Sequence, residues 1–275
     1  MLTRRNLLLT AAAATASVAV AGPTAQAALP QVNMEALIKA AQIDPRRADT
    51  AITTGSRDSV LQVERALQAR GLLAATYVDG HFGTSTISAY AAYQRSLGYS
   101  GLDATGLPGL TSLRLLGDQR YMVTLPLSPG STVAYRGVTV NTRTRAMLLE
   151  AERLLGRQLT LTQGSYTSGN SSSAGTHDGG GALDISVTDL STTYRTTVVG
   201  RLRRVGFAAW LRTPSQGDWP YHIHAIALAD TDQSAAAQHQ AGDYYLGLNG
   251  LANRAADDGP VVTPKLTWEE YQRTS

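Results

Sequence analysis

The sequence predicts an α+β fold in which a helical unit precedes a unit built on an antiparallel sheet. Apolar residues recur at helical spacing through much of residues 57–117. Beyond about residue 135, segments with the period of a strand mix with segments that have the period of a helix. Their order is strand, helix, strand, strand, helix, strand, strand, which indicates an α+β unit with an antiparallel sheet.

Composition excludes several kinds of site. The chain has 275 residues, of which 43% are hydrophobic and 16% charged, so it has room for one or two cores. It has no cysteine, which excludes a thiolate metal site, a cysteine nucleophile and disulfides. Without Arg4 and Arg5 the count is 22 basic against 21 acidic residues, a formal charge of +1. With no cluster of basic and aromatic residues, we expect no nucleic-acid partner.

Residues 1–27 have the pattern of a targeting segment. Arg4 and Arg5 come directly before an apolar run, and residues 25–27 form a small-x-small cleavage site. The segment resembles a twin-arginine signal peptide; an ordinary secretory signal is the alternative. Both predict an exported chain that starts near Ala28 and is secreted, extracellular or in the cell wall. No later stretch has the eighteen or so apolar residues that a membrane span needs. We also expect the protein to be a monomer.

The helical unit is predicted between two linkers, residues 28–56 and residues 118–134. The first linker contains one short helix, at about residues 34–41. Residues 57–117 contain three helices with apolar residues on one face, and Gly71 ends the first of them. Those apolar residues are Val60, Val63 and Leu67, then Ile87, Tyr90, Ala91 and Leu97, then Leu110, Leu113 and Leu116.

Short motifs connect this unit with a known family. Residues 79–83 have the sequence Asp-Gly-His-Phe-Gly, and Thr84 follows at a helix start. A Tyr-Gln pair at residues 93–94 and a second glycine turn at residues 106–111 complete the pattern. Over about sixty residues the chain is similar to the three-helix peptidoglycan-binding domain. The resemblance implies that residues 57–117 bind peptidoglycan.

The second unit is predicted over residues 135–275. Strands are expected at residues 137–140, 159–162, 182–187, 207–211 and 220–228, and helices after Asn141 and over residues 191–205. A loop rich in serine and glycine precedes the strand that begins at Ala182. From about Gln238 onward the pattern is irregular, and we expect a C-terminal segment that wraps over the sheet.

Four polar residues in this unit have the pattern of a metal site. His177 and Asp184 are separated by six residues, three of them glycines, which suits a loop that presents His177 and then enters a strand carrying Asp184. His222 and His224 lie on one face of their strand, roughly 6 to 7 Å apart. Hydrolytic zinc usually has three ligands drawn from histidine and carboxylate, with water in the fourth position. Taken singly, each segment also fits an ordinary turn.

The motif as a whole resembles a peptidase family. The spacing His-x-x-Gly-x-Ala-x-Asp, followed by His-x-His, resembles the zinc D-alanyl-D-alanine carboxypeptidases, which share a fold with the hedgehog and lysostaphin-type groups. The resemblance covers about residues 135–230. It implies zinc held by His177, Asp184 and His224, and a peptidase, of the D,D-carboxypeptidase or endopeptidase type, that acts on peptidoglycan stem peptides.

The sequence departs from this family at two places. Members usually carry an acidic residue three positions before the last histidine, where this chain has Tyr221, and the arginine expected within residues 162–170 is absent. His222 is therefore the first candidate for the general base, as in the lysostaphin-type relatives, and Asp218 is the second. Tyr221 is a candidate hydrogen-bond donor to the oxyanion. The alternative function is a cell-wall-binding protein whose peptidase fold binds metal but is catalytically impaired.

Overall fold

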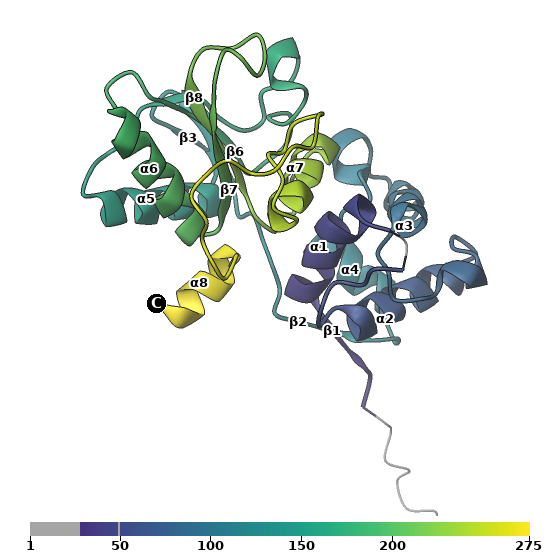
Figure 1. Ribbon diagram of the computed structural model, residues 1–275. Coiled ribbons are helices and arrows are strands. Elements are labelled where there is room, and N and C mark those ends of the chain that lie inside the picture. The colour runs from purple at the N-terminus through teal and green to yellow at the C-terminus, as the bar shows by residue number, and fades with distance from the viewer. Residues whose placement is uncertain (1–27, 49) are drawn as a thin grey trace, which may run out of the picture.

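The computed structural model describes residues 28–48 and 50–275, which form an α+β structure of helices and small sheets (Figure 1). The targeting segment predicted at residues 1–27 lies outside the described residues. Within the described part of the chain, no helix combines the length and the apolar character that crossing a membrane requires.

The first unit is helical. Its elements are β1 (Gln31–Asn33), α1 (Met34–Ile43), α2 (Arg57–Gln68), α3 (Thr84–Ser96), α4 (Leu110–Leu116) and β2 (Met122–Thr124). Short 3-10 helices lie between them at Asp44–Arg46, Ala75–Tyr77 and Gly101–Ala104. Asn33 begins α1, because its side chain accepts a hydrogen bond from the amide of Ala36 at 3.1 Å. The parallel pair β1 and β2 joins the two ends of the unit.

The first of the two segments expected as linkers, and the second as far as Leu127, belong to this unit, whereas the end of the second segment lies in the β3 strand of the other unit. Met34, Leu37 and Ile38 of α1 are fully buried in one core with α2, α3 and α4, and Leu127 from the second segment is buried there too. The helix expected at residues 34–41 is present as α1, but residues 28–56 do not form a linker around it. Helix α1 therefore forms part of the core of this unit together with α2, α3 and α4.

The second unit contains a four-stranded antiparallel sheet. Its strands are β5 (Leu161–Gln163), β6 (Ala182–Ser186), β7 (Phe207–Arg212) and β8 (His222–Ala227), in the order β5-β6-β8-β7. A separate hairpin pairs β3 (Thr132–Tyr135) with β4 (Val138–Asn141). The antiparallel arrangement predicted from the sequence is confirmed.

Period-two alternation gives this sheet two different faces. One face packs against α5 (Thr142–Leu155) and α6 (Thr192–Arg204) and contributes Leu183, Ile185, Phe207, Ala209, Ile223, Ala225 and Ala227 to the second core. The opposite face packs against α7 (Ala235–Tyr245) through Ala182, Ala208, Trp210 and Ile226. Asp184, His222 and His224 lie on this second face too, nearer the opposite end of the sheet. Helix α7 does not enclose that end, so polar side chains can face a pocket there.

Helix α7 also joins the two units, because it lies between the sheet and α1 (Figure 1). Gln42 of α1 donates to Gln233 at 2.7 Å, and Arg46 pairs with Asp243 of α7 through two contacts of 3.0 Å. The prediction of an irregular segment from about Gln238 onward is wrong in part, because α7 and α8 (Trp268–Thr274) are regular helices.

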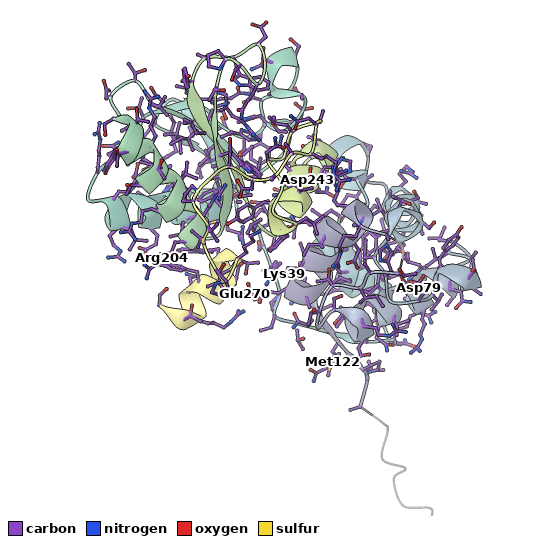
Figure 2. The ribbon with its side chains drawn as sticks, viewed as in Figure 1. Lys39, Asp79, Met122, Arg204, Asp243 and Glu270 are labelled. Carbon is purple, nitrogen blue, oxygen red and sulfur yellow. The ribbon has the colours of Figure 1, made fainter. Side chains whose placement is uncertain are left out.

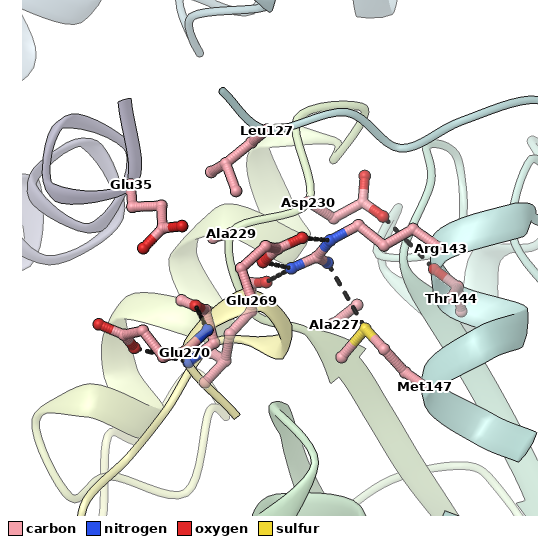
Figure 3. Close-up of polar contacts among 12 residues, drawn as sticks. Glu35, Leu127, Arg143, Thr144, Met147, Ala227, Ala229, Asp230, Glu269 and Glu270 are labelled. Atoms are coloured by element: carbon pink, nitrogen blue, oxygen red, sulfur yellow. Dashed lines mark hydrogen bonds and ion pairs between the residues drawn. The ribbon is translucent and has the colours of Figure 1, made fainter. Parts of the chain in front are cut away.

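Helix α8 is fixed at the same junction. Lys39 of α1 faces Glu270 of α8, with its Nζ 2.6 Å from one carboxylate oxygen (Figure 2). Arg143, at the start of α5, donates to both oxygens of Glu269 at 2.8 and 2.7 Å and to the carbonyl of Leu228 (Figure 3). These contacts hold the C-terminal helix against both units.

Candidate metal centre

Three side chains converge at the open end of the sheet. His177 lies in the loop before β6, Asp184 lies on β6, and His224 lies on β8 directly opposite Asp184. Their ligand atoms all lie within 4.8 Å of one another. His177 Nε2 is 3.3 Å from Asp184 Oδ1 and 3.3 Å from His224 Nδ1, and His224 Nδ1 is 2.7 Å from Asp184 Oδ1. This group can hold a metal ion.

Backbone contacts fix the loop that carries His177. The amide of Thr167 donates to the carbonyl of His177 at 2.8 Å, and the amide of Tyr166 donates to that of Gly179 at 3.0 Å. A Cβ at Gly179 would lie 2.3 Å from the carbonyl oxygen of Asp232, so only glycine fits there. Gly181 has a φ of +85°, a conformation that favours glycine, immediately before β6 begins.

The second nitrogen of each imidazole is already occupied. His177 Nδ1 lies 2.8 Å from the carbonyl oxygen of Gly164, and His224 Nε2 lies 2.9 Å from Oε1 of Gln240. Each of those oxygens can accept a proton from the ring nitrogen beside it. With a metal bound, this arrangement would leave His177 Nε2 and His224 Nδ1 unprotonated and facing Asp184. Such outer contacts, which set the tautomer and orient the ring, are typical of metal-binding histidines.

The charge states of the cluster suit a cation. Burial lowers the pKa of His224 to about 4, and the hydrogen bond to Asp184 offsets only part of this effect. Burial acts to raise the pKa of Asp184, but hydrogen bonds to His177 and His224 hold it well below its usual range. At neutral pH His224 is neutral and Asp184 is ionised, which are the forms that bind metal.

The cluster lies in the wall of a pocket of about 830 Å³. Loops surround the three residues there, from residues 170–176 on one side and 250–253 on another. The three predicted catalytic candidates, Asp218, Tyr221 and His222, line the same pocket. A peptide in this pocket would therefore contact both groups of residues.

The catalytic candidates differ in how close they lie to the cluster. His222 is half-buried, its Nε2 lies 3.7 Å from Asp184 Oδ1, and its Nδ1 lies 2.8 Å from the carbonyl oxygen of Pro220. That carbonyl makes Nδ1 the protonated nitrogen and leaves Nε2 free to accept a proton. Tyr221 is 51% exposed and Asp218 is exposed, so both lie at the rim.

Two residues of the site were not predicted from the sequence. Arg212 is the last residue of β7, it lines the pocket, and it pairs in register with His222. The alternation of the strand predicted at residues 207–211 places the next residue on the face of Trp210, but it does not indicate which strand lies beside that face. Gln240 lies on α7, a helix the sequence pattern did not predict, so no pattern indicated its contact with His224.

Comparisons of the chain with protein-family models, curated proteins and solved structures find no match. The features of this chain that indicate a function are the metal-binding group, the pocket around it and the sequence motifs.

The contact between Gln240 and His224 leads to a testable expectation. Gln240→Ala is expected to weaken metal binding by roughly ten- to a hundredfold, because His224 loses the acceptor that fixes its tautomer. Gln240→Glu keeps an acceptor at the same position and is expected to retain affinity. Competition with a chelator of known affinity measures both variants. Equal affinity of Gln240→Ala and the unchanged chain would show that Gln240 does not orient His224.

Proposed function

We propose that this protein is a secreted zinc-dependent peptidase that cleaves peptidoglycan stem peptides, as a D,D-carboxypeptidase or an endopeptidase. The observation that carries the proposal is the convergence of His177 Nε2, Asp184 Oδ1 and His224 Nδ1 in the wall of a large pocket. Two histidines, one carboxylate and space for water form a donor set typical of hydrolytic zinc. The resemblance of the two motif sets adds peptidoglycan as the substrate.

The donor atoms fit zinc. Ligands bound at about 2.0 to 2.2 Å in a tetrahedron lie roughly 3.3 Å from one another. Two of the three separations in the cluster are 3.3 Å, and the third, between His224 and Asp184, is 2.7 Å. With an acceptor beside the outer nitrogen of each ring, the three facing atoms could together bind one shared cation. Nitrogen and carboxylate donors without thiolate also suit other divalent metals, so metal analysis belongs to the test.

The residues around the cluster have distinct roles in this proposal. His177, Asp184 and His224 would hold the zinc ion, which would supply a bound water of lowered pKa and a Lewis acid for the scissile carbonyl. His222 accepts the proton of the attacking water at Nε2 and passes it to the departing amine, while the carbonyl of Pro220 holds its Nδ1 proton. Tyr221 donates a hydrogen bond from its hydroxyl to the developing oxyanion, and Asp218 is the second candidate for the base.

The helical unit has the proposed role of binding peptidoglycan. Its motif residues form the framework of the unit: Glu64 accepts from the amides of Asp79 and Gly80 at 3.0 and 2.8 Å. The Gln94 side chain bonds the amide of Gly106 and the carbonyl of Leu107, both at 2.8 Å. The motif therefore specifies two tight turns, which supports the family resemblance of this part of the chain. The hydrophobic core of this unit includes α1, and β2 pairs with β1. The test of binding therefore uses the whole chain rather than residues 57–117 alone.

The alternative is a wall-binding protein that holds metal without efficient chemistry. One observation favours it: Tyr221, at the position where the related peptidases carry an acid, lies at the rim with its ring 5.5 Å from the guanidinium carbon of Arg195. A phenol does not supply the carboxylate that those peptidases carry at this position.

Purified muropeptides and insoluble peptidoglycan distinguish the two functions. The chain is incubated with muropeptides in the presence of zinc, and products are identified by mass spectrometry, with a chelator-treated sample as control. New products that disappear with the chelator and return with zinc support the peptidase. Sedimentation with peptidoglycan without any product supports the alternative. A chain that neither cleaves nor sediments would refute both.

A further inference from the structure

Arg212 has an unoccupied hydrogen-bonding edge beside the metal-binding group. Its side chain is 3% exposed, and its guanidinium carbon lies 4.8 Å from the centre of the Trp210 ring. Nη1 donates to the carbonyl oxygen of Asn249 at 2.8 Å, which is the only hydrogen bond this guanidinium makes among the described residues. Nη2 is fully buried without an acceptor. The edge formed by Nε and Nη2 is thus free.

The charge of Arg212 is also uncompensated. The residue forms no ion pair within the described part of the chain, although Asp258, Asp184 and Asp257 act on it at longer range. Burial lowers the pKa of Arg212 to about 10, so the group is still charged at neutral pH. A buried cation without a partner is costly, and a buried donor without an acceptor adds to the cost. An anion bound from the pocket would remove both costs.

Other arginines of this chain show what the free edge accepts. Arg46 uses Nε and Nη2 to bind both oxygens of Asp243, each at 3.0 Å. Arg143 uses the same two nitrogens to bind Glu269, at 2.8 and 2.7 Å. Two parallel donors match the two oxygens of a carboxylate. At Arg212 the same edge has no carboxylate opposite it.

The position of Arg212 limits where that carboxylate lies on a ligand. Arg212 and His222 are direct cross-strand partners, whose Cβ atoms lie about 5 Å apart in such pairs. On the other side, a Cβ added at Gly250 would lie 3.4 Å from Nη2, so this loop packs against the guanidinium, and both residues line the pocket. Arg212 and His222 line the same pocket as the metal-binding group, so a carboxylate bound at Arg212 belongs to the part of a peptide that lies beside that group.

We propose that Arg212 binds the C-terminal carboxylate of the peptide in the pocket, so that the last peptide bond lies at the metal-binding group and a single amino acid is released. This inference rests on the proposed function, because it assigns the direction and the end of the substrate at the same site. Hydrolysis breaks the C–N bond, adds the hydroxyl of water to the acyl carbon and a proton to the departing nitrogen. The products are a shortened peptide and a free amino acid. Arg212 is a substrate-binding residue in this scheme.

Peptide binding to the metal-free full-length mature chain tests the assignment without turnover. Isothermal titration calorimetry compares N-acetyl-D-alanyl-D-alanine, its C-terminal amide, and N-acetyl-D-glutamyl-D-alanine amide, whose only carboxylate is on a side chain. The first peptide is expected to bind at least about tenfold more tightly than either amide, since one charge-assisted pair is lost in each amide. Arg212→Lys keeps the charge but loses the two-donor edge, and is expected to remove that difference while leaving the affinity for both amides unchanged.

Arg204→Lys is the matched control, because Arg204 is an exposed residue of α6 (Figure 2). It is expected to bind all three peptides as the unchanged chain does. Three results would each overturn the assignment. They are no binding of N-acetyl-D-alanyl-D-alanine, equal affinity for this peptide and its amide, and equal affinity for this peptide and N-acetyl-D-glutamyl-D-alanine amide. The unchanged chain alone gives these three results, so they do not depend on how a variant folds.

Cleavage of the same peptides by the zinc-loaded chain separates this assignment from the proposed function. Preference for the acid in binding, without cleavage of these peptides or of muropeptides, would leave the carboxylate site standing and refute the peptidase. Equal binding and cleavage of the acid and its amide would leave the peptidase standing and refute the role of Arg212. Cleavage of the acid alone, with release of free D-alanine, supports both.

Discussion

Replacing His177, Asp184 or His224 by alanine is expected to lower bound zinc from about one per chain to well below one. Each change leaves two protein ligands, and the atoms removed are those that lie within 4.8 Å of one another. Changes to residues that only orient a ligand already reduce metal affinity by roughly ten- to a hundredfold, so loss of a ligand itself is expected to cost more. Elemental analysis of the full-length mature chain after dialysis against a defined zinc concentration measures the effect.

Ser186→Ala is the control for these three substitutions. Ser186 lies on the same strand and the same face as Asp184, two residues further along, and is in register with His222. It is not part of the metal-binding group, so its replacement is expected to leave the zinc content unchanged. Far-ultraviolet circular dichroism reports whether each variant keeps its fold. A folded His177→Ala, Asp184→Ala or His224→Ala variant with one zinc per chain would show that the replaced residue is not a ligand.

The parts of the site that depend on local pattern were accessible from the sequence. Alternation in β6 and β8 predicted that Asp184 lies on a strand and that His222 and His224 share a face, and both predictions are confirmed. The glycines between His177 and Asp184 predicted a loop that leads into a strand, as found. These properties follow from a period of two residues and from backbone freedom at glycine, which act over a few residues.

Features that depend on distant segments were not accessible in the same way. The segment with α1 was expected as a linker because the partners of its apolar face, mainly α2, α3 and α4, come later in the chain. Helix α7 has the sequence Ala-Ala-Ala-Gln-His-Gln-Ala-Gly-Asp-Tyr-Tyr, with no stripe of large apolar residues. The helix packs against the sheet on one side and against α1 on the other. Its sequence therefore lacks the single apolar stripe and opposite polar face by which a surface helix is recognised. Small residues such as Gly242 allow this close packing, since a Cβ there would lie 2.1 Å from the carbonyl oxygen of Gln42.

The choice of strand neighbours determined the rest of the site. Arg212 joins the pocket because β7 pairs with β8, and pairing order in a sheet is not encoded in the pattern of a single strand. Gln240 joins it because α7 crosses the same face of the sheet. One of these segments precedes β8 in the chain and the other follows it. Spacing within the sequence therefore predicts the three residues of the metal-binding group but not the residues that surround them.

His222→Gln is expected to leave zinc near one per chain and to reduce hydrolysis by roughly 10² to 10⁴, the usual contribution of a general base. His222 Nε2 lies 3.7 Å from Asp184 Oδ1, yet His222 is not part of the three-residue metal-binding group. Its Nδ1 contact with the carbonyl of Pro220 leaves Nε2 as the proton acceptor, a function that an amide cannot replace. Zinc content and the rate of muropeptide cleavage are measured on the same preparation.

Three further measurements decide the identity of the base. Loss of zinc in His222→Gln would make His222 a fourth ligand, and a site closed by four protein ligands would favour the wall-binding alternative. Asp218→Asn is expected to change the rate little, because Asp218 is exposed at the rim; a fall as large as that of His222→Gln would transfer the role to Asp218. Tyr221→Glu introduces the acid of the related peptidases at a position that lines the pocket. An unchanged rate in Tyr221→Glu supports His222 as the base, whereas a marked increase would show that the missing acid limits the rate of this protein.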